Sequence, residues 1–161
     1  MSVNNQVSTL IGRLDKCNKI LLKQENEYAL FLKDDFPLLG KKNTTAMIMA
    51  EFITDYYTCL ETLFLRISQF FENNLSDARW HSDLLEKMTL NICGVRESVI
   101  SDKTYAILVE LMKFRHFRRY YFEMEYDWDK LDYLKKKFEE LPKDIRIDLD
   151  HFKLFLEKLS R

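Results

Sequence analysis

The sequence predicts an all-α fold, an up-and-down bundle of five to six helices. Glycine occurs 3 times and proline 2 times in 161 residues, too few for the tight turns that a β-rich fold requires. Apolar side chains recur at helical spacing along each long segment. Hydrophobic residues make up 47% of the chain and charged residues 32%, which excludes a disordered chain and suffices for a hydrophobic core. We therefore expect residues 1–161 to form a single domain.

Charge and cysteine usage limit the function classes further. The formal net charge is -1, so the chain does not coat nucleic acid through overall positive charge, and any such contact needs a local basic patch. Three widely spaced cysteines form no C-x-x-C pair and predict reduced thiols. The N-terminus lacks the apolar run of a signal peptide, and no stretch approaches the roughly 20 apolar residues of a membrane helix. These features predict a cytoplasmic protein that does not enter a membrane.

The first helix is expected over residues 5–33, where apolar side chains recur at helical spacing. We expect it to end at Asp34-Asp35-Phe36-Pro37, because a proline pushes the preceding residue out of the α region. The segment 40–43 then reads as a loop, and Thr44 or Thr45 is expected to cap the next helix.

The second helix, over residues 45–73, is the most apolar. It carries two stripes at helical spacing, one of Met49, Ile53, Tyr56, Leu60, Leu63, Ile67 and Phe70 and the other of Ile48, Phe52, Cys59 and Phe64. A helix that is apolar on two sides must be covered on two sides. It is therefore expected at the centre of the bundle or in a subunit interface. A shorter helix follows over residues 77–90.

Three further helices are expected in the second half of the chain. An ordered loop around Gly94 leads to Ser101, which caps the fourth helix, and Asp127 caps the fifth. Pro142 is expected to break the fifth helix, and Asp144 to start a sixth.

At the junction between the fourth and fifth helices, a group of basic side chains is followed directly by a group of acidic ones. It reads FRHFRRYYFEMEYDW over residues 114–128. The basic side chains are Arg115, His116, Arg118 and Arg119, and acidic ones follow at Glu123, Glu125, Asp127 and Asp129. The chain has no glycine-rich phosphate loop, H-E-x-x-H or G-x-S-x-G motif. Its histidines at 81, 116 and 151 belong to separate predicted helices, so we expect no metal site and no cofactor.

Arg115 shares a helical face with Leu108, Leu111 and Phe122 and therefore needs partners, because a buried unpaired charge is costly. One interpretation is a structural ion pair, with Glu110, Glu123 or Glu125 or with an acid on another helix. The other is a guanidinium aimed at a phosphate, where its fork geometry matches two oxygens.

In the second interpretation the neighbouring side chains complete an RNA site. Lys113, Arg118 and Arg119 supply positive potential, and Tyr120 or Tyr121 stacks on an exposed base. The alternative for these aromatic rings is packing at the end of a helix.

Four segments together resemble the HepT-like branch of the HEPN superfamily, the small helical toxins of toxin–antitoxin pairs. They are YYTCLETLFLRIS, RWHSDLLEKM, GVRESVISDKTY and ELMKFRHFRRYYFEMEYDWDKL, and the resemblance covers residues 45–159, leaving 1–43 as an N-terminal helix and loop. It implies a HEPN-type homodimer with a basic cleft between its subunits, in which RNA is cut without a metal ion. It also implies a minimal nucleotidyltransferase antitoxin that attaches AMP to a tyrosine of the toxin.

The active motif of that family is an arginine, a histidine five residues later and a tyrosine two residues beyond. Arg115 matches the arginine, but the histidine position holds Tyr120 and the tyrosine position holds Phe122, which has no hydroxyl. His116 directly follows the arginine and points about 100° away from it on a helix.

The sequence leaves two functions from different classes open, beside a third interpretation without a nucleic-acid role. The first is an RNA-cleaving enzyme that uses Arg115 with His116 or Tyr120. The second is a non-catalytic module that binds RNA, a nucleotide or a nucleotidyltransferase. A helical protein without a nucleic-acid role is the third interpretation.

Overall fold

The computed structural model describes residues 3–72, 80–120 and 125–161. Within them the secondary structure is helical apart from an isolated β-bridge between Ile92 and Arg96. The helical elements are α1 (Val3–Leu30), the π-helix η1 (Phe31–Asp35), α2 (Phe36–Leu39), α3 (Asn43–Phe71), α4 (Trp80–Met88), α5 (Asp102–Tyr120) and α6 (Trp128–Leu159). The predicted all-α class is confirmed.

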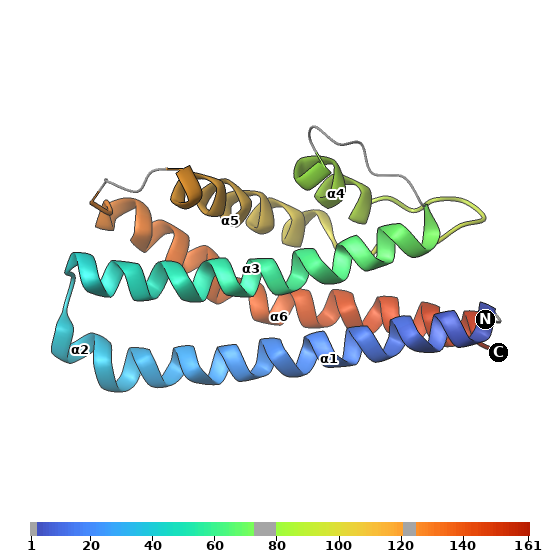
Figure 1. Cartoon of the computed structure of the whole chain (residues 1–161), viewed down its shortest axis with the longest axis horizontal. Coiled ribbons are helices and arrows are strands. Elements are labelled where there is room, and N and C mark those ends of the chain that lie inside the picture. The colour runs from blue at the N-terminus through green and yellow to red at the C-terminus, as the bar shows by residue number, and fades with distance from the viewer. Residues whose placement is uncertain (1–2, 73–79, 121–124) are drawn as a thin grey trace.

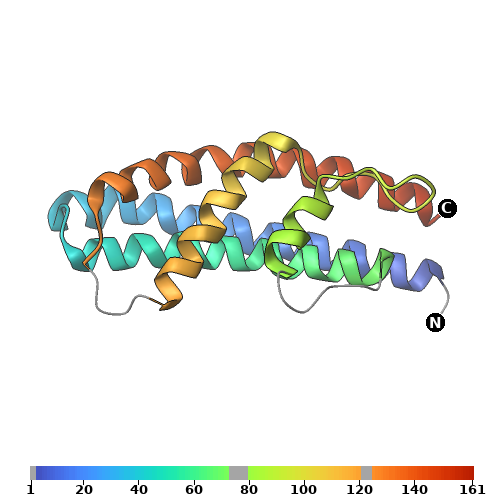
Figure 2. The ribbon, with the colours of Figure 1, turned by 90° about the horizontal axis from the view of Figure 1, so that it is seen from above.

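The long helices α1, α3, α5 and α6 run in alternating directions along the molecule (Figure 1). From above, α4 and α5 lie obliquely to α1, α3 and α6 (Figure 2). Helix α3 contacts α1, α4, α5 and α6, so its two apolar stripes are covered from several sides. This confirms the first of the two expectations for α3, a central position. No described helix combines the length and the apolarity that crossing a membrane requires.

The predicted end of the first helix at residues 34–37 is wrong. Phe36 keeps a helical backbone (φ -58°, ψ -42°), and the helical path continues to Leu39, where Gly40 ends it at φ 67°. Two features explain the continuation. The π-helix changes the hydrogen-bond register just before Pro37, and Pro37 then occupies the first turn of α2, where a missing N–H is harmless.

The caps of the later helices agree with prediction better than the cap of α3. Ser101 Oγ accepts a hydrogen bond from the Thr104 amide (3.3 Å), and Asp127 Oδ1 accepts one from the Asp129 amide (3.0 Å). The expected threonine cap of α3 is wrong, because α3 begins at Asn43 after Lys42, which makes no side-chain cap. Thr45 is buried inside the first turn instead.

The predicted break at Pro142 is also wrong, since α6 continues through it. Buried apolar side chains keep helical spacing on both sides of the proline: Leu131, Leu134, Phe138, Leu141, Ile145, Leu149, Phe152 and Leu156. Burial of this continuous stripe outweighs the loss of one backbone hydrogen bond. Local propensity is overridden by tertiary packing here.

This arrangement predicts that Pro142→Ala stabilises the protein. Alanine restores the amide that can bond to the Phe138 carbonyl, and we expect a gain of about 2 kcal/mol, less than the full helix-interior penalty of proline because proline also restricts the unfolded chain. Urea denaturation of the two proteins measures the difference. A loss of stability would mean that the surrounding helices pack against a bend that only proline provides.

Cys17, Cys59 and Cys93 are free thiols in the structure. Cys17 of α1 and Cys59 of α3 lie with their Sγ atoms 3.5 Å apart. Their hydrogen bond, together with burial, raises the pKa of Cys17, and the same bond lowers the pKa of Cys59. Cys59 packs against the core, in agreement with the packing role expected of it.

Candidate functional site

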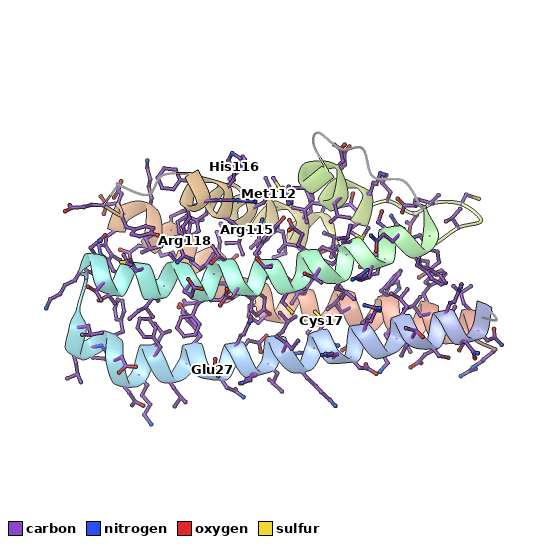
Figure 3. The ribbon with its side chains drawn as sticks, in the orientation of Figure 1. Cys17, Glu27, Met112, Arg115, His116 and Arg118 are labelled. Carbon is purple, nitrogen blue, oxygen red and sulfur yellow. The ribbon has the colours of Figure 1, made fainter. Side chains whose placement is uncertain are left out.

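Arg115 extends from α5 toward α3, as Figure 3 shows. Its Nη1 lies 3.6 Å from Glu61 Oε1, and its guanidinium carbon lies 5.9 Å from the centre of the Tyr57 ring. The ion pair foreseen for this arginine thus exists, and its partner is an acid on another helix. The side chain nevertheless remains 27% exposed, so pairing with Glu61 does not remove it from solvent.

Glu61 is a buried carboxylate that contacts three side chains in the described part of the structure. It is 5% exposed, and besides Arg115 it contacts the hydroxyl of Tyr57 and the imidazole of His81. The Tyr57 hydroxyl donates to Oε2 over 2.8 Å, and His81 Nδ1 lies 2.7 Å from the same oxygen. Burial raises the pKa of Tyr57, and the neighbouring Glu61 carboxylate raises it further. The tyrosine therefore stays protonated and serves as a fixed donor to Glu61.

Arg118 makes a second bridge from α5 to α3. Its Nη1 donates to Thr54 Oγ1 (2.7 Å) and its Nη2 donates to Glu51 Oε2 (2.5 Å). Partial burial lowers the pKa of Arg118, but the hydrogen bonds to Glu51 and Tyr126 outweigh it and raise the pKa on balance. Arg118 is thus held in place as a permanent cation.

A cleft of about 340 Å³ lies between the end of α5 and the middle of α3. Its lining residues are Thr54, Asp55, Thr58, Arg115, Arg118 and Arg119. Asp55 is the acid on this lining. Burial and the nearby Glu51 raise the pKa of its carboxyl, whereas Arg118 lowers it. Three guanidinium groups line this small cleft, and Glu61, Glu51 and Asp55 balance part of their charge. Guanidinium groups are suited to bind phosphate oxygens.

The structure brings together only part of the set of residues predicted from sequence. Lys113 Nζ lies 3.8 Å from Glu110 Oε1. Lys113 lines a different, mainly apolar cavity of about 550 Å³ together with Phe114 and Phe117. His116 is exposed on the side of α5 away from α3 (Figure 3). Neither residue therefore belongs to the cleft that contains Arg115.

The remaining sequence-predicted residues follow the described end of α5. Tyr120 is the last residue of α5, and its side chain lies outside the described part of the structure. Tyr121, Phe122 and Glu123 lie outside the described residues altogether. Their predicted roles in stacking, modification or pairing stay predictions.

Residues 48–156 match the family model described as HepT-like protein. The chain belongs to the HepT-like family. No curated protein and no solved structure matches the chain. The HepT-like segment begins in the first turns of α3 and ends near the end of α6, so it contains every residue of the arginine cleft. Helix α1 precedes the match and packs against α3 and α6.

Sequence reasoning on this HepT-like protein missed Glu61, Tyr57 and His81 as site residues. Glu61 directly follows Leu60 of the apolar stripe, and a carboxylate at such a position signals a buried polar contact. Nothing in the spacing of His81 relates it to Arg115, which lies on another helix. Among the residues that the structure describes, no group of three or more histidine, cysteine or carboxylate side chains is placed to hold a metal ion.

Proposed function

We propose that this HepT-like protein is a toxin-type endoribonuclease that binds RNA at the cleft of Arg115, Arg118 and Arg119 and cuts it without a metal ion. The observation that carries the proposal is the placement of the motif arginine. Arg115 enters the cleft from α5 with 27% of its side chain exposed, beside two further arginines. Such a cluster matches the negative charge that develops on the phosphoryl oxygens during phosphodiester cleavage.

The proposal includes two partners that follow from family membership. A second copy of the chain would pair through the region around the end of α5, so that two arginine clefts face one RNA. A minimal nucleotidyltransferase would act as the antitoxin. Because Phe122 lacks the hydroxyl that accepts AMP, this antitoxin would act on another group or by binding alone.

A non-catalytic RNA-binding module is the second candidate. The sequence favours it at two positions, since Tyr120 and Phe122 replace the histidine and tyrosine of the family motif. Loss of a general acid or base typically lowers a rate by about 10²–10⁴-fold. The arginine cleft would remain and would still bind RNA phosphates.

Incubation of the purified protein with single-stranded RNA in EDTA separates the two candidates. A metal-independent endoribonuclease produces fragments that end in a 2′,3′-cyclic phosphate and a 5′-hydroxyl, because the ribose 2′-hydroxyl is the nucleophile. Binding without fragments favours the non-catalytic module. Absence of both binding and cleavage contradicts both candidates.

Binding itself is tested by Arg119→Gln beside the control Lys23→Gln. Arg119 lines the cleft, whereas Lys23 is an exposed cation on α1. Removing one phosphate contact should weaken RNA binding and lower the slope of log K against log salt concentration by about 0.7. Lys23→Gln should leave both quantities unchanged. Equal effects of the two variants would mean that RNA responds to total charge rather than to this cleft.

A further inference from the structure

One buried carboxylate joins the motif arginine to a histidine from a neighbouring helix. Glu61 faces Arg115 with Oε1 (3.6 Å) and His81 with Oε2 (2.7 Å). The two partners of Glu61 come from α5 and α4, which lie over the same side of α3 and contact each other (Figures 1 and 2). Arg115 and His81, which lie 34 positions apart in sequence, thereby contact the same carboxylate.

The contact with Glu61 also sets the chemistry of the imidazole. A carboxylate only accepts hydrogen bonds, so the nitrogen that faces it, Nδ1, carries the proton. In the neutral ring the other nitrogen, Nε2, then bears the lone pair. The side chain of His81 is 36% exposed, so its ring reaches solvent while Glu61 holds one edge. A histidine oriented by a buried carboxylate is the arrangement that general-base catalysis uses.

We propose that His81 is the general base of RNA cleavage in this protein and replaces the histidine that the motif lacks at position 120. The inference rests on the proposed ribonuclease function. His81 Nε2 removes the proton of a ribose 2′-hydroxyl, O2′ attacks phosphorus, and the O2′–P bond forms as the P–O5′ bond breaks. Water protonates the leaving O5′, and the hydroxide so formed takes the proton from His81. Arg115 stabilises the charge on the phosphoryl oxygens.

The other candidates for the base fit less well. His116 is exposed on the side of α5 away from the cleft. A tyrosine hydroxyl, with an ordinary pKa near 10, is a weak general base at neutral pH. His151 lies on α6, where its Nε2 is 3.8 Å from Glu97. His81, by contrast, contacts Glu61, the carboxylate that pairs with Arg115.

The test compares His81→Gln with the control His151→Gln in the EDTA cleavage assay. We expect His81→Gln to lower the single-turnover rate by about 10²–10⁴-fold and to change the Kd for RNA by less than about twofold. His151→Gln should cleave at the wild-type rate. Adding imidazole to His81→Ala should restore part of the rate, because free imidazole can occupy the vacated space and accept the proton. A structural role for His81 alone predicts no such rescue.

The outcomes separate this inference from the function on which it rests. If His81→Gln cleaves RNA at the wild-type rate, His81 is not the general base, and the proposed ribonuclease function is unaffected. Loss of cleavage in His116→Gln, with His81→Gln active, assigns the base to His116 instead. Should His81→Gln lower the melting temperature, the imidazole experiment decides, and absence of rescue overturns the proposal. A wild-type protein that binds RNA but never cuts it overturns both.

Discussion

Replacing Arg115 by alanine should lower the rate of the proposed RNA cleavage by about 10²–10³-fold, the usual effect of removing one preorganised group that stabilises a developing anion. The guanidinium enters the cleft beside Arg118 and Arg119 and is the cation held by buried Glu61. Single-turnover cleavage with saturating protein measures the chemical step separately from binding. We expect a smaller change in RNA affinity, because two arginines of the cleft remain.

Arg115→Lys is the matched variant that distinguishes a structural arginine from a functional one. Lysine keeps a positive charge opposite Glu61, so the melting temperature should stay near that of the wild type. It lacks the planar fork that contacts two phosphate oxygens at once, so cleavage should still fall. If lysine restores both stability and cleavage, only the charge of this residue matters. If Arg115→Ala cleaves at the wild-type rate, the arginine is a structural partner of Glu61 alone.

The all-α architecture was predictable because it depends on local features. Scarce glycine and proline, apolar periodicity and the caps at Ser101 and Asp127 act within a few residues of chain. The errors at Pro37 and Pro142 share a physical cause. Proline disfavours helix continuation locally, but a π-helix before Pro37 and a continuous buried stripe around Pro142 compensate in the folded protein. Such compensation depends on packing partners that are remote in sequence.

The candidate site was only half predictable for the same reason. Arg115 could be singled out because it lies on an apolar helical face and therefore needs a partner. The identity of that partner depends on how α5 packs over α3, which no local pattern specifies. His81 and Glu61 meet only because α4 folds back over α3. Lys113 shows the converse. It is close to Arg115 in sequence, but it lines a different cavity.

The largest loss of stability is expected from Arg96→Ala. The Arg96 side chain is fully buried and is anchored to groups at the ends of two helices. Nε donates to Glu72 Oε1 over 2.7 Å, and the two Nη atoms donate to backbone carbonyls of Lys87 (2.7 Å), Leu90 (3.0 Å) and Glu97 (3.2 Å). Glu72 caps the end of α3, and Lys87 lies in the last turn of α4. One guanidinium therefore ties α3, α4 and the following loop together.

Alanine would leave the carboxylate of Glu72 and three carbonyls without this donor. Removing one partner of a buried ion pair costs about 3–5 kcal/mol, a large share of the roughly 5–15 kcal/mol that stabilises a typical domain. We expect the melting temperature to fall by roughly 6–20 °C. Urea denaturation measures the loss of unfolding free energy, and calorimetry measures the fall in melting temperature.

Arg146→Ala provides the matched control for this effect. Arg146 also pairs with a glutamate, Nη2 lying 3.0 Å from Glu25 Oε2, but its side chain is 48% exposed. An exposed pair contributes about 0–1 kcal/mol, so this variant should unfold close to the wild-type midpoint. Both variants lose one arginine. The difference between their free energies of unfolding therefore measures the effect of burying the arginine and of its contacts with the carbonyls. Equal destabilisation would contradict the view that Arg96 holds α4 against α3, and with it the basis for the fixed position of His81.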